Sequence, residues 1–289
     1  VTNCAVNSPW DDAIVPKSSY ALGYARSTEN LTIANCFVTG GYQLGTMLDG
    51  TWKKFPEDTH GAWHTGRIKL GTESNGGFKN IAITNCIFED CQGLALETVD
   101  GALLEDVTIT NITRRDIRTA PIFMRLGSRL RGPAGSTKTG ALRRVTLSNI
   151  VCSNAASQIS SIISGVPGYE IEDVKLQNIY MQHRGGGTKE QAALMPPEDE
   201  KKYPEPNMFG ATPSQGFYLR HVKNVELSGI EIAAISSDAR PGFVLQNVEG
   251  ADFFHVKTPL GVEPIALRSS SDVRALWVRG VKDGPVNSQ

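Results

Sequence analysis

The sequence has little of what several large classes of protein require. The 289 residues carry a formal net charge of −1, so no basic surface of the kind that holds nucleic acid is expected. No apolar run approaches the ~20 residues that a membrane-spanning helix needs. No His stands in a ligand pattern with the five cysteines, so no metal site is predicted, and only residues 188–202 suggest even a short helix.

The chain also lacks an initiator Met and a signal peptide. It opens with Val1-Thr2-Asn3-Cys4, which is the tail of a phrase that recurs further on. We therefore expect that coils preceding Val1 are missing from this sequence. Because a solenoid cut within a coil exposes an open strand edge, the expected state is a monomer unless a cap or a partner covers that edge.

One phrase is repeated along the length of the chain. Each copy is a run of largely β-branched residues that closes on Asn or Gly and an apolar residue: LTIANC (31–36), IAITNC (81–86), VTITNI (107–112), VTLSNI (145–150), VKLQNI (174–179), VELSGI (225–230), FVLQNV (243–248) and LWVRGV (276–281). So many copies of a strand-and-turn unit predict a stacked repeat fold. Spacings of 26 to 33 residues between closing residues fit one coil of a parallel β-helix, while the spacing of 18 before Asn247 suggests an irregular coil.

The predicted fold is therefore all-β, a single parallel β-helix domain over residues 1–289. The longer spacings indicate three inserts, at 41–66, 118–141 and 184–216. Inserts in solenoids often gather on the binding face. The alternative is a β-propeller, which needs four strands in every ~40–45 residues. One phrase in every coil fits the β-helix better.

Within a phrase, side chains alternate between the two faces of the strand. This alternation predicts that Ile81, Ile83 and Asn85 all face inward. The closing Asn residues of successive coils would then form an internal ladder of stacked amides. The predicted members of this ladder are Asn35, Asn85, Asn111, Asn149 and Asn178.

Three of the cysteines, Cys4, Cys36 and Cys86, each follow the Asn of a phrase and are expected to stack as a column. Equivalent positions in neighbouring coils lie ~4.8 Å apart, which is within the Cα–Cα range of disulfides. Free Cys is also a good small buried hydrophobe. Reduced core cysteines are the favoured prediction.

Two adjacent carboxylates, Asp11 and Asp12, come soon after the first phrase. Neighbouring side chains of a strand point to opposite faces, so both can face one groove only where the backbone kinks. The apolar Trp10 beside them favours a raised carboxyl pKa through desolvation, as a general acid requires. The alternative interpretation is a turn with two solvated carboxylates.

The first hundred residues resemble a known family. Asn3-Cys4, Asp11-Asp12-Ala13-Ile14 and Lys17-Ser18, followed by GTESNGGFKNIAITNC (71–86), are similar to the Asp-Asp region of glycoside hydrolase family 28. These are the polygalacturonases and rhamnogalacturonan hydrolases, which fold as right-handed parallel β-helices. The resemblance implies a secreted or periplasmic inverting glycosidase that cleaves galacturonate-containing pectic polysaccharide and needs no metal or organic cofactor. The long inserts favour a pocket closed at one end, and hence exo action or a branched substrate.

The same resemblance implies catalytic roles. Asp11 is expected to be the general acid, and Asp12 to help activate water together with a third Asp about one coil upstream of Val1. The histidine of the family is not matched as a string, and His64 or His60 is expected in its place. Glu97 stands where the family has a Lys, which suggests a neutral or differently oriented sugar in the adjacent subsite.

Other residues are predicted to hold the substrate. Arg67, Lys69 and Lys17 suit a uronate carboxylate, because Arg in particular pairs with a carboxylate bidentately. Glu73 and Arg125 are weaker candidates for contact with the sugar. All five would lie around one groove.

Loop residues complete the predicted site. Trp52 and Trp63 are expected to stack on sugar faces, and Tyr203 and Glu205 to form part of a lid. Two other functions stay open. A β-helix polysaccharide lyase needs an Arg or Lys base and usually a carboxylate cluster for Ca²⁺. A glycan-binding or structural β-helix needs no catalytic pair.

Overall fold

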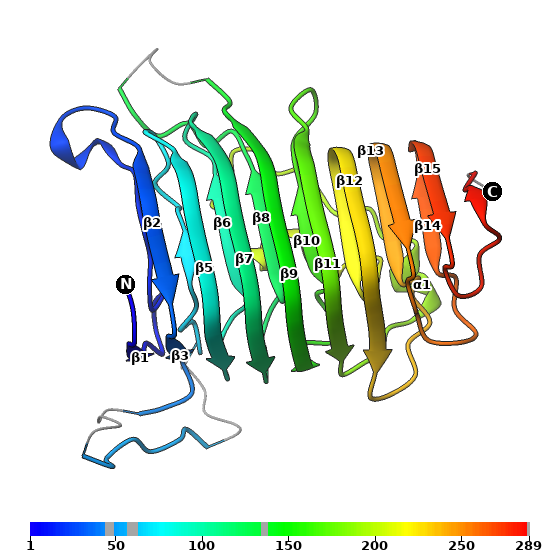
Figure 1. Ribbon diagram of the computed structural model, residues 1–289, viewed down its shortest axis with the longest axis horizontal. Helices are drawn as coiled ribbons and strands as arrows, with labels where there is room; N and C mark the ends of the chain where they lie inside the picture. Colours follow the sequence, from blue (N-terminus) through cyan, green and yellow to red (C-terminus); the bar gives the residue numbers. More distant parts are fainter. Residues whose placement is uncertain (44–48, 57–62, 134–137, 288–289) are drawn as a thin grey trace.

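The computed structural model describes residues 1–43, 49–56, 63–133 and 138–287. Parallel strands pair from one coil to the next along the chain, and the sheet that they form curls around a common axis (Figure 1). The predicted parallel β-helix is confirmed. None of the described helices is long and apolar enough to cross a membrane.

Each coil has three faces, and face 1 carries the short strands. It consists of β4 (Lys69–Leu70), β6 (Leu94–Thr98), β8 (Ile122–Leu126), β10 (Ser161–Ser164), the first four residues of β12 (Phe217–Ala234) and of β13 (Phe243–Phe254), and β14 (Ile265–Arg268).

Faces 2 and 3 are formed by long strands that turn a corner without ending. These are β5 (Phe78–Glu89), β7 (Leu103–Arg115), β9 (Ala141–Ala155), β11 (Ile171–His183) and the remainder of β12 and β13. Face 2 also contains β2 (Thr28–Ala34) and β15 (Ser271–Leu276), and face 3 contains β1 (Ala5–Asn7) and β3 (Phe37–Thr39). A short antiparallel strand, β16 (Gly284–Pro285), pairs with β15.

Helical residues are few. They form η1 (Tyr20–Leu22), α1 (Lys189–Ala192) and η2 (Pro206–Phe209). The helix suggested at 188–202 is therefore confirmed only as the single turn α1, which begins with a capping box between Thr188 and Gln191.

One residue in the left-handed conformation turns the chain from face 2 to face 3. At Asn35, Asn85, Asn111, Asn149 and Asn178, φ lies between 52° and 57°, a region that Asn visits more readily than most residues. From Asn85 onward, each Nδ2 donates to the Oδ1 of the Asn one coil before, at 2.8–3.3 Å. The predicted ladder of amides is present.

The predicted side of this ladder is wrong. The five Asn residues are exposed on the outside of the corner, whereas Ile81 and Ile83 are buried as predicted. A left-handed residue interrupts the alternation of the strand, so the residue that follows it, such as Cys36 or Cys86, turns inward. A pattern of period two contains no such interruption.

Two of the repeated phrases, FVLQNV (243–248) and LWVRGV (276–281), do not close at the corner between face 2 and face 3 as the others do. Asn247 lies at the turn from face 1 to face 2, between residues that pair with different faces of β12. His255, at φ 53°, occupies the Asn corner in that coil, and Trp277, at φ 55°, occupies it in the next. The short spacing before Asn247 is therefore a change of corner and not an irregular coil.

Two of the three predicted inserts lie between strands, and the third contains a strand. Residues 184–216 fill the connection from β11 to β12, and 41–66 lie between β3 and β4, although 44–48 and 57–62 are outside the described residues. The range 118–141 is partly wrong, because it includes β8, a regular strand of face 1.

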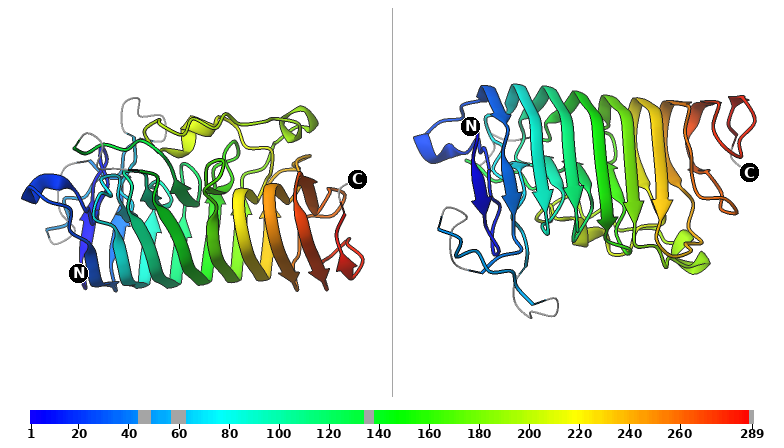
Figure 2. Two further views of the ribbon diagram at one scale, coloured as in Figure 1. Left: turned by 90° about the horizontal axis from the view of Figure 1, so that it is seen from above. Right: turned by 60° about the horizontal axis from the view of Figure 1, so that its bottom comes forward.

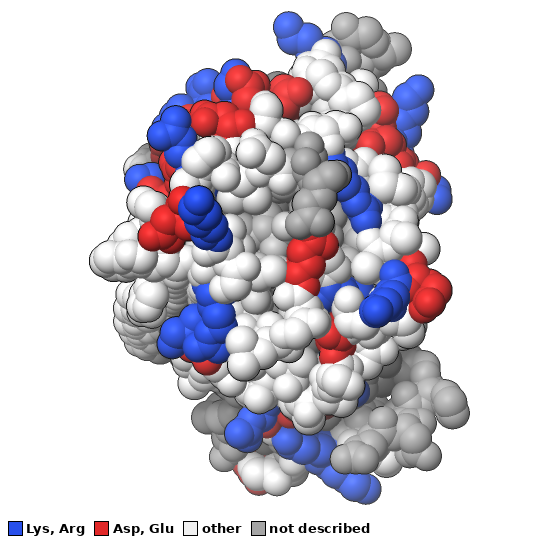
Figure 3. All heavy atoms as spheres, turned by 90° about the vertical axis from the view of Figure 1, so that its right-hand side faces the viewer, with Lys and Arg blue, Asp and Glu red and all other residues white. Residues whose placement is uncertain are grey.

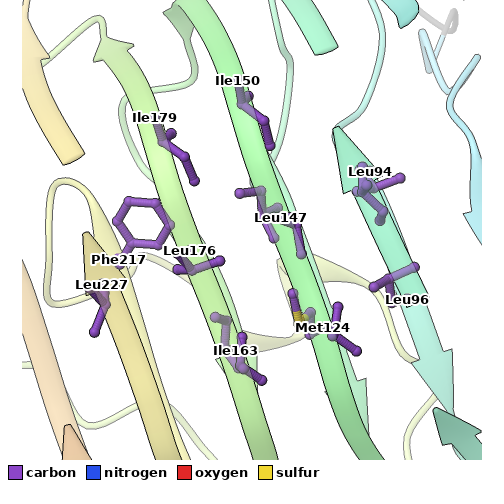
Figure 4. Packing of buried hydrophobic residues seen from close by; sticks show 14 of the residues in the cluster. Leu94, Leu96, Met124, Leu147, Ile150, Ile163, Leu176, Ile179, Phe217 and Leu227 are labelled. Atoms are coloured by element: carbon purple, nitrogen blue, oxygen red, sulfur yellow. The ribbon is translucent and has the colours of Figure 1, made fainter. Parts of the chain in front are cut away.

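The inside of the coil is one continuous apolar core that extends from Ile14 to Val278. Columns of like side chains build it, such as Leu96, Met124 and Ile163 on face 1 (Figure 4). All five cysteines are free, as predicted, and Cys36, Cys86, Cys91 and Cys152 are buried. On the outside, the surface seen from the C-terminal side mixes Lys and Arg with Asp and Glu (Figure 3).

Candidate active site

A cavity of about 500 Å³ opens on the outside of the first coils. One wall comes from residues 184–216, which we call the strap. The lining side chains are Trp10, Asp11 and Asp12 after β1; Trp63, Thr65, Gln92 and Thr119 in the loops before β4, β6 and β8; and Tyr203, Glu205, Pro206 and Asn207 in the strap. Segments far apart in the sequence therefore meet at this cavity.

One buried guanidinium joins two of the lining carboxylates. Arg67 donates from Nε to Asp12 Oδ1 at 2.7 Å and from Nη2 to Glu205 Oε1 at 2.6 Å. The Arg67 side chain is fully buried, while that of Asp12 is 8% exposed and that of Glu205 is 26% exposed. Asp12 and Glu205 are therefore neighbours on one guanidinium.

Lys69 connects the same carboxylates to a third one. Its Nζ lies 3.3 Å from Glu205 Oε1 and 3.5 Å from Asp12 Oδ2. The same Nζ lies 3.4 Å from Oε2 of Glu97, which also accepts a hydrogen bond from the hydroxyl of Thr72 at 2.9 Å. Lys69 and Glu97 are both buried and do not line the cavity.

Burial and charge act in opposite directions on this cluster. Burial raises the pKa of Glu97 to about 7, against the opposing effect of Lys69 and Arg67. Burial alone lowers the pKa of Arg67 and of Lys69, but the carboxylates around them outweigh it, so both pKa values are raised. Both cations therefore stay charged at physiological pH.

The sequence places these groups by simple alternation at the start of β4. Ile68 is buried in the core, so the flanking Arg67 and Lys69 point out of the coil. The backbone N–H of Ala13 donates to the carbonyl of Arg67 at 2.9 Å, which holds the Asp11-Asp12 loop against the same coil. Asp11 is exposed, and its Oδ1 accepts a hydrogen bond from the backbone N–H of Asp12 at 2.8 Å.

The strap lies across the outside of the coils (Figure 2, left view). Its Phe209 packs edge-on against Phe123 and Tyr218, with ring centroids 6.1 and 6.5 Å apart. Phe123 and Tyr218 alternate with inward residues of face 1 and so point outward. A second, smaller apolar cluster thus forms between the strap and face 1.

Arginines of face 1 fasten the strap. Arg125, Arg220 and Arg268 each donate to a backbone carbonyl of the strap, at 2.7–2.8 Å. They stand in the same register on face 1. Burial and the neighbouring Arg220 lower the pKa of Arg125 to about 10. Arg125, predicted to bind substrate, is an anchor beneath the strap and does not line the cavity.

Two further predicted ligands, Lys17 and Glu73, also lie outside the cavity lining. They pair with each other at 2.7 Å, and their side chains are 50% and 31% exposed. Partial burial alone raises the pKa of Glu73, but the hydrogen bond and charge of Lys17, a backbone hydrogen bond and the charge of Arg129 together outweigh it and lower the pKa overall.

His64 does not line the cavity either. Its Nδ1 lies 3.3 Å from Asp90 Oδ1, and its ring packs against Phe55 at 5.6 Å. Burial lowers the pKa of His64, although Asp90 opposes this effect. The neighbouring Thr65 lines the cavity instead, and His60 lies outside the described residues.

The aromatic predictions divide in the same way. Trp63 lines the cavity and is 69% exposed. Trp52 packs against Tyr42 at 5.0 Å, within the same insert. Tyr203 is in the cavity wall, where its hydroxyl lies 3.0 Å from that of Thr72. The strap residues predicted as a lid are thus part of the site.

Sequence reasoning missed Gln92, Thr119 and Asn207. Gln92 and Thr119 each stand shortly before a strand of face 1, as Thr65 does. This shared position is the signal that could have found them. The Oε1 of Gln92 and the Oγ1 of Thr119 have no hydrogen-bond partner among the described residues. Both atoms are buried, so neither is open to a sugar in this structure.

Comparison with known proteins adds nothing to this geometry, since no family model, curated protein or solved structure matches the chain. Within the described ranges, no group of three or more His, Cys, Asp or Glu side chains is placed to hold a metal ion.

Proposed function

We propose that the chain is an inverting glycoside hydrolase whose active site is the cavity beside Asp11 and Asp12. The observation that supports this proposal is the meeting of carboxylates and exposed Trp rings in one cavity of about 500 Å³. Carboxyl groups on the two sides of a glycosidic bond supply the acid and the base of hydrolysis. Aromatic rings offer rigid apolar area for a sugar face.

Asp11 is the proposed proton donor to the glycosidic oxygen. It is exposed in the cavity, and the described ion pairs of Arg67 and Lys69 go to other carboxylates. Asp12 has a cation near each of its oxygens, at 2.7 Å and 3.5 Å, which fixes its position. A fixed carboxylate of this kind suits the orientation of water.

The charges around the cavity bear on the substrate. Among the described residues that line it, the charged ones are all carboxylates. The predicted contact of Arg67 and Lys69 with a uronate finds no support in the geometry, because both cations are buried and paired with carboxylates of the protein. We therefore place a neutral sugar in the cavity. Of the galacturonate-containing polymers, rhamnogalacturonan suits this arrangement better than polygalacturonan.

The strap supports exo action. It is fastened along the outside of face 1 by Arg125, Arg220 and Arg268. A polymer therefore cannot run along this face beyond the cavity on that side. We propose that one end of the polysaccharide enters the cavity. The enzyme itself is proposed to be secreted or periplasmic.

A polysaccharide lyase is less well supported, because the Arg or Lys base that it needs must be accessible. Arg67 and Lys69 are 0% and 1% exposed. The test is an assay on rhamnogalacturonan and on polygalacturonan that follows both reducing ends and ultraviolet absorbance. We expect reducing ends from rhamnogalacturonan and none with Asp11→Asn. Unsaturated products indicate a lyase, and binding without products indicates a glycan-binding protein.

A further inference from the structure

A third carboxylate stands in the cavity beside the Asp pair, and the strap supplies it. We propose that Glu205 is a catalytic residue, the general base that takes a proton from the attacking water. This inference rests on the proposed glycosidase function. It assigns to the strap a part in the chemistry beyond closing one end of the cavity.

The contacts of Glu205 suit this role. All of its ion pairs within the described part of the chain use Oε1, which lies 2.6 Å from Arg67 Nη2 and 3.3 Å from Lys69 Nζ. Its Oε2 is left for water, and 26% of the side chain is exposed. Asp12 is less suited, because each of its oxygens has a cation close by and only 8% of its side chain is exposed.

The backbone of Glu205 is also fixed in advance. It stands between Pro204 and Pro206, and a residue before proline is restricted to extended conformations. Its φ of −131° and ψ of 148° lie in that region. On the C-terminal side, Phe209 at the end of η2 is buried against face 1. A catalytic group needs this kind of support, because small misplacements reduce the rate strongly.

The proposed step balances in atoms and charge. The bond from the anomeric carbon to the leaving oxygen breaks while Asp11 gives its proton to that oxygen. Water attacks the anomeric carbon from the opposite side, forms the new bond, and gives one proton to Oε2 of Glu205. The products are two sugars, one with inverted anomeric configuration. Glu205 then releases its proton to solvent and Asp11 takes one up.

The test compares Glu205→Ala with a matched strap variant, Glu198→Gln. Glu198 also pairs the strap with β12, at 3.0 Å to His221 and 3.5 Å to Arg220, but it does not line the cavity. We expect kcat of Glu205→Ala to fall by about 10²–10⁴-fold with little change in KM, whereas Glu198→Gln should keep the kcat of the wild type. Sodium azide, which needs no general base, should restore turnover in Glu205→Ala alone and yield a glycosyl azide.

Three results overturn the inference: a kcat of Glu205→Ala close to that of the wild type, an equal loss in Glu198→Gln, or a loss that azide does not restore. If the wild type is active in these cases, the proposed glycosidase function is unaffected. A wild type that releases no sugar from either polymer overturns both proposals together. Glu205→Gln, which keeps the shape of the side chain, serves as a second variant if the Ala variant does not fold.

Discussion

The ammonium group of Lys69 lies 3.4 Å from a carboxylate oxygen of Glu97, and both side chains are buried outside the coil, beneath the strap. The lysine also contacts Asp12 and Glu205. The charged groups of the cavity thus rest on a buried layer of compensating charges. Substitutions of Glu97 and of Arg67 should therefore have different effects, the first on the pH dependence of stability and the second on stability itself.

The first prediction concerns pH. Burial raises the pKa of Glu97 from its ordinary 4.5 to about 7, so the folded protein binds this proton more tightly than the unfolded chain. The contribution of Glu97 to the free energy of unfolding is then fully present below about pH 4.5 and is lost as pH rises toward 7. We expect urea denaturation between pH 4 and 8 to show this decline in the wild type relative to Glu97→Gln. A difference between the two that does not change with pH contradicts the prediction.

The second prediction concerns Arg67. Replacing it by Met leaves Asp12 and Glu205 without their shared donor, and losing one member of a buried ion pair costs about 3–5 kcal/mol. A control is Lys79→Met, whose pair with Glu29 is exposed to solvent and should contribute far less to stability. Chemical denaturation measures both. Equal effects of the two substitutions would show that the buried cluster is not formed.

The third prediction concerns the ladder of amides. Asn111→Ala removes two amide contacts and places a Cβ-bearing residue without a polar side chain at φ 57°. The left-handed conformation disfavours such a residue by roughly 1–2 kcal/mol. Asn111→Gly should be less destabilising, since Gly adopts this φ readily. The exposed neighbour Thr113→Ala is the control, and thermal unfolding gives the order. A Gly variant less stable than the Ala variant contradicts the account.

The fourth prediction concerns an arginine inside the coil. Arg114 is buried near Cys91 and Cys152, and its guanidinium lies 5.2 Å from the centre of the Phe88 ring. Its Nε and Nη2 have no hydrogen-bond partner in the part of the chain that the structure describes. Because an apolar side chain avoids the desolvation of a buried charge, we expect Arg114→Met to be neutral or stabilising. Urea denaturation checks this expectation, and a loss of more than about 3 kcal/mol, as for a broken buried pair, contradicts it.

The fold was readable from the sequence because its repeat is local. Each coil contains a phrase such as IAITNC, and period-two alternation correctly placed Ile81 and Ile83 inside. The position of Asn85 was not readable in this way, since one left-handed residue reverses the alternation. Asn247 was misplaced for a similar reason, because more than one corner of the coil uses a left-handed residue.

The site was readable only in part. Asp11 and Asp12 are adjacent in the sequence, and Arg67 and Lys69 share one strand end, so a local pattern could single them out. Glu205 reaches Arg67 across 138 positions. That contact depends on where the strap lies, which is set by Phe209 and by arginines of later coils. For this reason the sequence predicted a lid but not the ion pair that the lid makes.

The most direct test of the central claim is to follow hydrolysis of rhamnogalacturonan by proton NMR in the wild type and in Asp11→Asn. The account predicts that the first product carries the inverted anomeric configuration. It also predicts that Asp11→Asn, an exposed substitution, lowers kcat by about 10²–10⁴-fold without a change in melting temperature. A product with retained configuration, or full activity in Asp11→Asn, would contradict it.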